Sequence, residues 1–395
     1  MSMIDKSMRK SMILGINAYN IRNGGGVTHL VELLRAAELP GHGFNQAIIW
    51  GNKNTLDKID NKPWLIKRHE PLLDRGLFFR IFWQSIRIHK LASSAGCDVL
   101  FVPGGSDSCK FFPTVTLSQN MLPFEWREML RYGFSFLTLK FFLLRWIQGR
   151  SFKKSAGVIF LTQYAKDAIG AVIGRMDGCA EIIPHGINPI FRCPPRPQYE
   201  FLGSQLKICR VLYVSSVEPY KHQWHVVSGV AKLLNCGVEV KLDLVGPPAS
   251  GLPLLRRAIN ELDPKGQFVE YHGEMHYEKL SEVYKNADIV IFASSCENMP
   301  NILIESMASG LPIACSNRGP MPEVLRDGGV YFDPESPDEI CGALYSLICS
   351  TELRTDKAAS AFNLSKKFSW IRCADETFKF LAFVASGRSS KEPWH

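Results

Sequence analysis

Residues 288–312 read DIVIFASSCENMPNILIESMASGLP. After Asp288 the stretch opens with an apolar, β-branched run up to Ala293, which is typical of a buried parallel strand. The turn that follows leads into an amphipathic helix. We expect this helix to begin near Pro300, because proline suits the first helical position. A second apolar run starts at Pro312, and this strand, helix, strand order is typical of a parallel α/β sheet.

The same alternation extends over nearly the whole chain. Two series of strands are predicted, at 12–17, 46–50, 98–102, 114–118, 157–161 and 181–184, and at 210–215, 238–245, 267–272, 288–293, 312–316 and 330–332. Between them lies a segment with three prolines in four positions, which cannot continue a helix or sheet. We therefore predict an α/β fold with two doubly wound parallel-sheet domains and a ligand cleft between them. The expected parts are residues 1–192, a linker at 193–209, residues 210–367, and a helix over about 368–395 that packs back onto the first domain.

Composition narrows the class of protein. The 395 residues are 46% hydrophobic and 21% charged, which excludes a disordered or collagen-like chain. The eleven cysteines are scattered, without the spacing of a zinc site, and we expect reduced thiols in a cytoplasmic protein. The most apolar stretch, 134–147, contains Lys140 and Arg145 and is too short to span a membrane.

Charge is distributed unevenly along the chain. Residues 1–200 carry a net charge of +11, whereas residues 201–395 carry −3. Seven of the basic residues lie between Trp126 and Lys154, where Phe134, Leu137, Phe141 and Leu144 recur at helical spacing. This pattern is typical of a basic amphipathic helix at an anionic membrane surface. An ordinary helix with a solvated basic face explains it about equally well. A nucleic-acid motif is not visible, and we expect no nucleic-acid partner.

The turn and helix at 296–312 contain the strongest candidate site residues. Glu297 lies on the loop after the strand, followed by Asn298 and Met299. The amides of Asn301 and Ile302 fall at the helix start, where the helix dipole favours an anion such as a diphosphate. Glu305, about one turn further on, can accept hydrogen bonds from a diol such as ribose. The alternative is a pair of solvated glutamates, which the dipole favours in any first helical turn.

The pattern of two glutamates eight residues apart that runs into SMASGLP resembles the retaining glycosyltransferases of family 4. Further similar blocks follow in the family's order: NGGGVTHLVELLR at 23–35, FFRIFWQSIRIHKLASSAGCDVLFVPGGS at 78–106, LSQNMLPFEWRE at 117–128, IIPHGIN at 182–188, VSSVEPYKHQ at 214–223, RGPMPEVL at 318–325 and YFDPESPDEI at 331–340. The resemblance implies the GT-B fold, in which two Rossmann-like domains face a central cleft. It also implies a member of the bacterial cell-surface polysaccharide type.

Roles for single residues follow from this resemblance. Glu305 would hold the nucleotide ribose, and Glu297 with the backbone of Asn298 and Met299 would hold the donor sugar. Lys221 would pair with the diphosphate, as a point charge beside phosphates. Gly25 and Gly26 would let the backbone approach the donor.

The chain departs from the family pattern at three places. Ser216 stands where an arginine is common, Gln119 and Asn120 stand where many members have a histidine near the reacting centre, and Pro300 replaces a glycine. Gln119 or Asn120 could still donate a hydrogen bond to the sugar or the acceptor. His185, in the turn of IIPHGIN, is expected to order the hinge, and His29, His222, His272 and His276 are isolated in the sequence.

The resemblance implies a hexosyltransferase that takes a sugar from a UDP-, GDP- or dTDP-sugar. The acceptor would be a lipid-linked glycan or a lipopolysaccharide precursor at the cytoplasmic face of the membrane. We expect no cofactor and no catalytic metal, because the sequence has no D-x-D pattern. Two alternatives remain: a catalytically impaired donor-binding partner of a glycan assembly complex, and a nucleotide-sugar epimerase or phosphorylase of the same fold.

Overall fold

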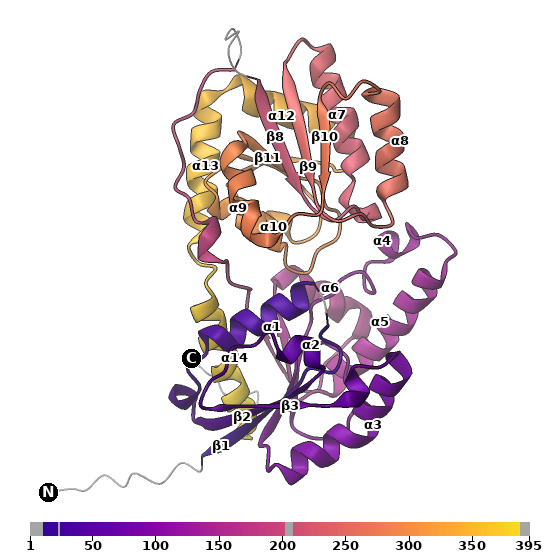
Figure 1. Cartoon of the computed structure of the whole chain (residues 1–395), viewed down its shortest axis with the longest axis vertical. Helices are drawn as coiled ribbons and strands as arrows, with labels where there is room; N and C mark the ends of the chain where they lie inside the picture. The colour runs from indigo at the N-terminus through magenta and orange to yellow at the C-terminus, as the bar shows by residue number, and fades with distance from the viewer. Residues whose placement is uncertain (1–10, 23, 202–207, 388–395) are drawn as a thin grey trace, which may run out of the picture. The chain divides into compact units, whose positions relative to one another are not determined.

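The chain folds into two units, each built on its own sheet (Figure 1). The computed structural model describes residues 11–22, 24–201 and 208–387. The N-terminal unit comprises Met1–Phe124, Leu139–Gly186 and Trp370–His395, and the C-terminal unit comprises Glu125–Thr138 and Ile187–Ser369. Our expected first domain, 1–192, includes residues 125–138 and 187–192, whereas in the structure both segments group with the C-terminal unit.

The N-terminal unit contains a seven-stranded parallel sheet in the order β3-β2-β1-β4-β5-β6-β7. Its strands are β1 (Met12–Asn17), β2 (Phe44–Gly51), β3 (Leu65–His69), β4 (Val99–Val102), β5 (Thr114–Leu117), β6 (Gly157–Phe160) and β7 (Cys179–Ile182). The helices of this unit are α1 (Gly25–Ala36), α2 (Lys53–Leu56), α3 (Leu77–Ser94), most of α5 (Phe136–Lys154), α6 (Gln163–Ile173) and α14 (Trp370–Ala385). Strands β4, β5 and β6 are buried along their whole length, which explains their continuous apolar runs.

The last helix of the chain, α14, is part of the N-terminal unit, where it packs against α1 and β4. Phe378, Phe380 and Leu381 on this helix are buried. A Cβ atom at Gly157 would lie 3.0 Å from the Phe380 ring, so glycine lets the helix approach the start of β6 closely. The N-terminal unit is therefore completed by residues from the far end of the sequence.

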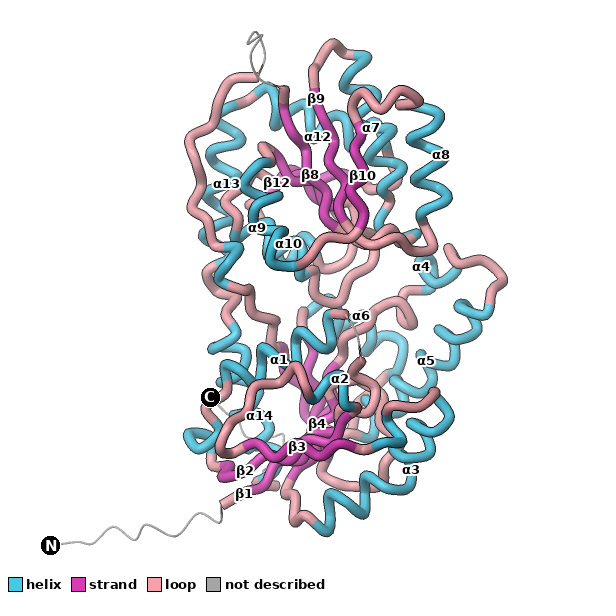
Figure 2. Tube along the Cα trace, in the orientation of Figure 1, coloured by secondary structure: helices cyan, strands magenta, loops and turns pink. Residues whose placement is uncertain are grey.

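The C-terminal unit contains a six-stranded parallel sheet in the order β10-β9-β8-β11-β12-β13. Its strands are β8 (Cys209–Val214), β9 (Val240–Val245), β10 (Val269–Gly273), β11 (Ile289–Phe292), β12 (Ile313–Ser316) and β13 (Gly329–Phe332). Its helices are α4 (Trp126–Leu130), α7 (Gln223–Asn235), α8 (Leu252–Leu262), α9 (Tyr277–Asn286), α10 (Asn301–Ala308), α11 (Met321–Leu325), α12 (Pro337–Cys349) and α13 (Thr351–Ser365). Figure 2 shows α7 and α8 on one side of these strands and α9 and α10 on the other.

The prediction of two doubly wound parallel α/β halves is confirmed, and every predicted strand has a counterpart. The sequence analysis missed one strand, β3, whose sequence is LIKRH. It lies at the edge of the sheet, where its charged residues reach solvent, so the apolar pattern of a central strand is absent.

The basic segment at 126–154 differs from the expectation. It forms two helices, α4 and α5, and Phe134 lies between them, outside either helix. Of the residues expected on the apolar face, Phe141 is buried and Leu137 is 38% exposed. Leu139, Leu143 and Trp146, which were not assigned to that face, are 66%, 56% and 65% exposed. The apolar side chains of α5 therefore face solvent as well as the core. No helix among the described residues is long and apolar enough to cross a membrane.

The turn after α10 is closed by a glycine that the backbone requires. Gly310 has a φ angle of +68°, in the left-handed region. A Cβ atom there would lie 2.5 Å from the carbonyl oxygen of Cys193, whose own amide donates to the carbonyl of Ala308 (2.9 Å). The proline-rich segment is thus fastened to the end of α10 within the C-terminal unit.

We predict that Gly310→Ala lowers the free energy of unfolding by at least 1–2 kcal/mol, roughly the cost of a left-handed conformation for alanine, with the clash added. Gly342→Ala is the matched control: Gly342 lies in α12 with nothing within 4 Å of its Cβ position, and alanine there favours the helix by up to about 1 kcal/mol. Thermal and urea unfolding of the two variants measure this difference. Equal effects of the two substitutions would contradict the assigned role of Gly310.

Candidate active site

A buried ion pair lies at the carboxyl ends of the two central strands of the C-terminal sheet. Lys221 follows β8 and Glu297 follows β11, and the Nζ atom of Lys221 bonds to Oε1 of Glu297. The two side chains are only 7% and 15% exposed. Because strand order reverses between β8 and β11, this is the topological switch point, where open α/β sheets bind their ligands.

Aromatic rings surround the lysine. Its Nζ atom lies 5.2 Å from the ring centroid of Tyr220 and 5.3 Å from that of Phe292, within the range of cation–π attraction. The hydroxyl of Tyr213 donates to the carbonyl of Lys221 (2.7 Å), which fixes the backbone of the loop. The ammonium is therefore held in place, and its charge is neutralised by Glu297.

The helix after this loop, α10, begins at Asn301 with Pro300 as its N-cap. The amide of Asn301, which we expected to face an anion, is not free for that contact, because its N–H donates to the carbonyl of Met299 (2.9 Å). Asn298 and Met299 are buried, and Ile302 is partly buried in the first turn of the helix.

Glu305 lies inside the unit and is 8% exposed. The hydroxyl of Tyr277, at the start of α9, donates to its Oε1 atom (2.9 Å). Burial raises the pKa of Glu305 to about 7, and the Tyr277 hydrogen bond opposes that shift. The carboxyl is thus poised to change its charge near neutral pH.

Ser216, the residue at the common arginine position, lies in the turn after β8. Its carbonyl accepts the side-chain amide of Gln223 (2.9 Å) and the backbone amide of Glu218 (2.9 Å). These bonds shape the loop that leads to Lys221.

The remaining predicted residues belong to the N-terminal unit. Gly25 begins α1, with Gly24 as its N-cap, and a Cβ at Gly26 would lie 2.9 Å from Oε1 of Gln119. The side chain of Asn120 accepts the amide of Leu122 (3.2 Å) and so closes a turn. The structure thus brings Gly26 and Gln119 together. In the C-terminal unit it brings Lys221 and Glu297 together.

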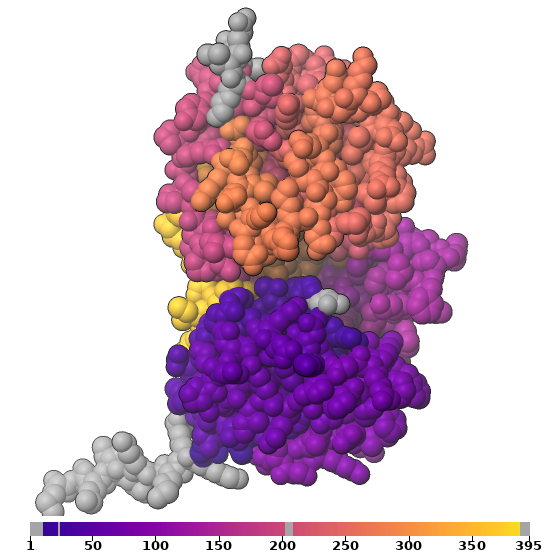
Figure 3. Space-filling view, viewed as in Figure 1, coloured from indigo at the N-terminus to yellow at the C-terminus, as the bar shows by residue number. Residues whose placement is uncertain are grey.

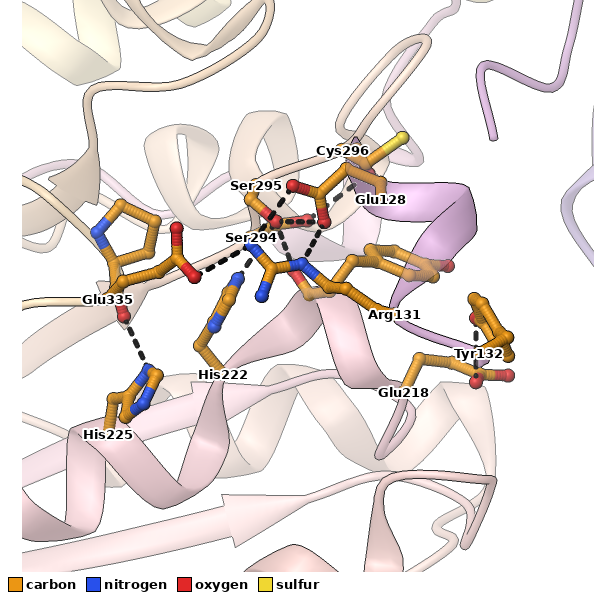
Figure 4. A network of polar contacts seen from close by, with 12 residues as sticks. Glu128, Arg131, Tyr132, Glu218, His222, His225, Ser294, Ser295, Cys296 and Glu335 are labelled. Atoms are coloured by element: carbon orange, nitrogen blue, oxygen red, sulfur yellow. Dashed lines mark hydrogen bonds and ion pairs between the residues drawn. The ribbon is translucent and has the colours of Figure 1, made fainter. Parts of the chain in front are cut away.

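Sequence reasoning missed a polar network that reaches the loop of Glu297 (Figure 4). Ser295 donates to Oε2 of Glu128 on α4 (2.7 Å) and lies 2.8 Å from Nε2 of His222. Arg131 binds the same Glu128 oxygen (2.6 Å) and also Glu335 (2.8 Å). The residues are up to 207 positions apart, so no local pattern reveals the network.

His222 has a role in this network that its isolated place in the sequence did not indicate. It has a φ angle of +53°, a rare conformation for a residue with a side chain, and it caps α7. Burial, followed by the nearby charges of Arg131 and His225, lowers the pKa of His222 to about 3. The imidazole is therefore neutral at physiological pH.

One group of side chains in the described residues could offer metal ligands: Asp243, Glu270 and His272, with ligand atoms within 4.8 Å of one another. Arg210 already donates to both carboxylate oxygens of Asp243 (3.1 and 2.9 Å), and His272 lies 2.9 Å from the same carboxylate. The donor set is engaged by cationic and N–H groups, so it does not fit a metal ion well.

A comparison with protein families found a match that covers the C-terminal part of the chain. Residues 201–363 match the model of the family "Glycosyl transferases group 1". The Lys221–Glu297 pair and Glu305 all lie within that match. We call residues 201–363 the group 1 segment; it contains the candidate site of the C-terminal unit.

Two relatives illustrate the sequence similarity. The chain is 29% identical over 110 residues to O-antigen chain mannosyltransferase B of Escherichia coli. The aligned region covers 28% of this chain and 29% of that protein. It is 27% identical over 184 residues to D-inositol 3-phosphate glycosyltransferase of Corynebacterium kroppenstedtii, covering 44% of this chain and 40% of that protein. The matches thus span well under half of the length of these curated relatives.

Solved structures match over nearly the whole chain. Sucrose-phosphate synthase from Thermosynechococcus elongatus has a TM-score of 0.75 at 15% identity and covers 95% of this chain and 100% of its own. HepE of Anabaena, solved in complex with UDP and glucose, has a TM-score of 0.67 at 17% identity, with coverages of 94% and 99%. WaaG, a glycosyltransferase involved in lipopolysaccharide biosynthesis, has a TM-score of 0.67 at 13% identity, with coverages of 93% and 99%. The predicted GT-B fold is confirmed.

We predict a pH-dependent stability term from Glu305. The folded carboxyl keeps its proton up to about pH 7, whereas the unfolded one releases it near 4.5, so the free energy of unfolding falls as pH rises through this window. In the unmodified protein the free energy of unfolding, measured with urea, should fall by about 2–3 kcal/mol between about pH 5 and about pH 8 because of this group. In Glu305→Gln that fall should be absent.

The matched control is Glu282→Gln, because Glu282 is an exposed glutamate on the adjacent α9. It should keep the pH dependence of the unmodified protein. The same slope in the Glu305 variant as in the unmodified protein would disprove the raised pKa.

We also predict that Glu128 and Ser295 are coupled. A double-mutant cycle of Glu128→Ala and Ser295→Ala should give an interaction free energy of about 1–2 kcal/mol, since the bond is buried and one partner is charged. The control pairs Glu128→Ala with Ser250→Ala, because Ser250 bonds Glu218 instead, and these two effects should add. Additive effects in both cycles would show that the Glu128–Ser295 bond contributes nothing.

Proposed function

We propose that this chain is a retaining glycosyltransferase that transfers a hexosyl group from a nucleoside-diphosphate sugar to a lipid-linked glycan or lipopolysaccharide precursor. The observation that carries the proposal is the Lys221–Glu297 pair at the switch point of the group 1 segment. Two relatives are named as a mannosyltransferase and a glycosyltransferase, and a similar structure was solved with UDP and glucose. Both observations support a nucleoside-diphosphate sugar as the donor.

Donor binding would exchange partners at the ion pair. The diphosphate takes the place of Glu297 beside Lys221, and the released carboxylate accepts hydrogen bonds from hydroxyls of the sugar. Burial strengthens both interactions, because charges attract more strongly where water is excluded. Glu305 accepts hydrogen bonds from the two hydroxyls of the ribose. The positive end of the α10 dipole stabilises the negative charge of the diphosphate. No metal or cofactor enters this scheme.

The chemical step breaks the bond between the anomeric carbon and the diphosphate oxygen. The acceptor hydroxyl oxygen forms its bond to that carbon on the same face, and its proton passes to the departing phosphate. Lys221 stabilises the negative charge that develops on the nucleoside diphosphate. Front-face attack of this kind follows from the family resemblance and from retention.

The acceptor is proposed to reside at a membrane. The N-terminal unit exposes large apolar side chains on α3 and α5, among them Phe78 at 77% and Leu139 at 66%. Exposed apolar area of this extent beside basic residues is typical of a surface that contacts lipid. In Figure 3 the part of the chain that contains α3 and α5 is drawn in purple to magenta. The proposed location is the cytoplasmic face of the membrane, with the protein bound peripherally.

The test incubates the protein with UDP-, GDP- and dTDP-sugars and a membrane extract, and follows release of the nucleotide. Lys221→Ala should lower kcat/KM about 100-fold or more, because it removes a charge that acts on the leaving group. Lys232→Ala, at an exposed lysine of α7 that pairs with Asp338, is the control and should leave kcat/KM unchanged. NMR of the glycosidic product should show the anomeric configuration of the donor.

Glu305→Ala should weaken nucleotide binding about tenfold in calorimetry, the effect of losing the hydrogen bonds between the ribose and the carboxyl group. Consumption of no donor, together with unchanged nucleotide affinity in this variant, would refute the proposal. Nucleotide binding without turnover would instead identify a donor-binding partner subunit.

A further inference from the structure

A cavity of about 440 Å³ opens between α5 and α6 in the N-terminal unit, and no step of the proposed reaction uses it. At one point of its lining the helices approach closely, because a Cβ at Gly149 would lie 3.0 Å from Cγ2 of Ile173. Its size falls in the range of small-molecule sites.

Four cations line this cavity: Arg145, Arg150, Lys153 and Lys154. Among the described residues that line it, none is acidic, and none of the four makes an ion pair within the described part of the chain. The Nη1 atom of Arg145 is buried without a hydrogen-bond partner there. Four like charges around one small volume repel one another unless an anion lies between them. The cavity is therefore matched to a multiply charged anionic group such as a phosphate.

The other walls of the cavity are apolar. Phe142 and Trp146 contribute aromatic side chains from α5, and Val172 and Ile173 contribute aliphatic ones from α6. Trp146 is 65% exposed, and the guanidinium of Arg150 lies 5.9 Å from its ring centroid.

Along α5 the two kinds of side chain are separated. Leu139, Leu143 and Trp146 follow each other on one exposed face at the start of the helix, and Arg150 and Lys153 continue the same face toward its end. A ligand that fits this arrangement has a charged head at one end and a hydrocarbon chain at the other. A free inorganic anion would leave the apolar walls uncovered.

We infer that the groove between α5 and α6 binds the phosphate-bearing headgroup of an anionic lipid in a bilayer. The phosphate lies among the four cations, and the hydrocarbon region contacts Phe142, Trp146 and the exposed leucines of α5. This inference deepens the proposed membrane-linked acceptor and rests on that proposal. The proposed function requires only that the protein adsorbs to a negatively charged membrane. The inference adds a specific binding site for one lipid headgroup.

The test is flotation of the full-length protein with vesicles of phosphatidylcholine alone and with phosphatidylglycerol added. The protein should float only with the anionic vesicles, and added salt should weaken the binding. Arg150→Gln/Lys153→Gln should reduce the vesicle partition coefficient about 10- to 30-fold, which is the expected effect of two interfacial charges. Lys53→Gln/Lys58→Gln removes the same charge from exposed lysines of the same unit and should reduce it less than threefold.

A second measurement places the lipid at the groove. Brominated lipid should quench tryptophan fluorescence, and Trp146→Phe should remove most of the quenching while leaving the protein bound. Equal flotation with neutral vesicles, equal partition of the two charge variants, or unchanged quenching in Trp146→Phe would overturn the headgroup site. Binding of inorganic phosphate without vesicle binding would overturn the lipid assignment.

This test needs no donor and no turnover, so its outcome is separate from that of the proposed reaction. The Arg150→Gln/Lys153→Gln protein should keep its nucleotide affinity in solution, because both residues lie in the N-terminal unit and the group 1 segment covers residues 201–363. Normal nucleotide binding with lost flotation supports the groove alone. Lost nucleotide binding in the unmodified protein refutes the reaction and leaves the groove standing.

Discussion

The pairing of Lys221 with Glu297 is the constraint around which the C-terminal unit is arranged. Two charges taken out of water cost several kcal/mol each unless they face one another with good geometry. The loops after β8 and β11 must therefore keep a fixed separation, and the amide of Ser295 donates to the carbonyl of Tyr220 (2.8 Å) to join them. Strands β8 and β11 are neighbours in the sheet, so the sheet already brings the two loops close together. The ion pair then fixes the distance between the loops. A ligand that offers an anion to Lys221 and hydroxyl donors to Glu297 can take the place of this interaction.

The fold followed from local chemistry to a large extent. Parallel strands read as apolar runs in the sequence, and twelve of the thirteen strands among the described residues were predicted from such runs. The edge strand β3 was not predictable, since LIKRH has only two apolar residues, followed by three basic or polar ones, and lacks the signature of a buried strand. The start of α10 at Asn301 was predictable within one residue from the position of Pro300.

The candidate site was predictable only where its residues are close in sequence. Glu297 and Glu305 lie eight positions apart on one turn and helix, and their importance is visible in the sequence. Glu128 lies 167 positions from Ser295, and its contact arises because α4 belongs to the C-terminal unit. The same limit explains the error on α5. Helical spacing shows which side chains share a face, but it does not show which face the rest of the unit covers.

The place of α14 has a consequence for synthesis on the ribosome. The N-terminal unit buries Phe378, Phe380 and Leu381, which are among the last residues of the described chain to be translated. Until they emerge, the surface around Gly157 and α1 that they cover stays uncovered, although the rest of the seven-stranded sheet is already present. All strands of the C-terminal unit emerge earlier, so that unit can complete its fold first. The order of completion is thus the reverse of the order of translation.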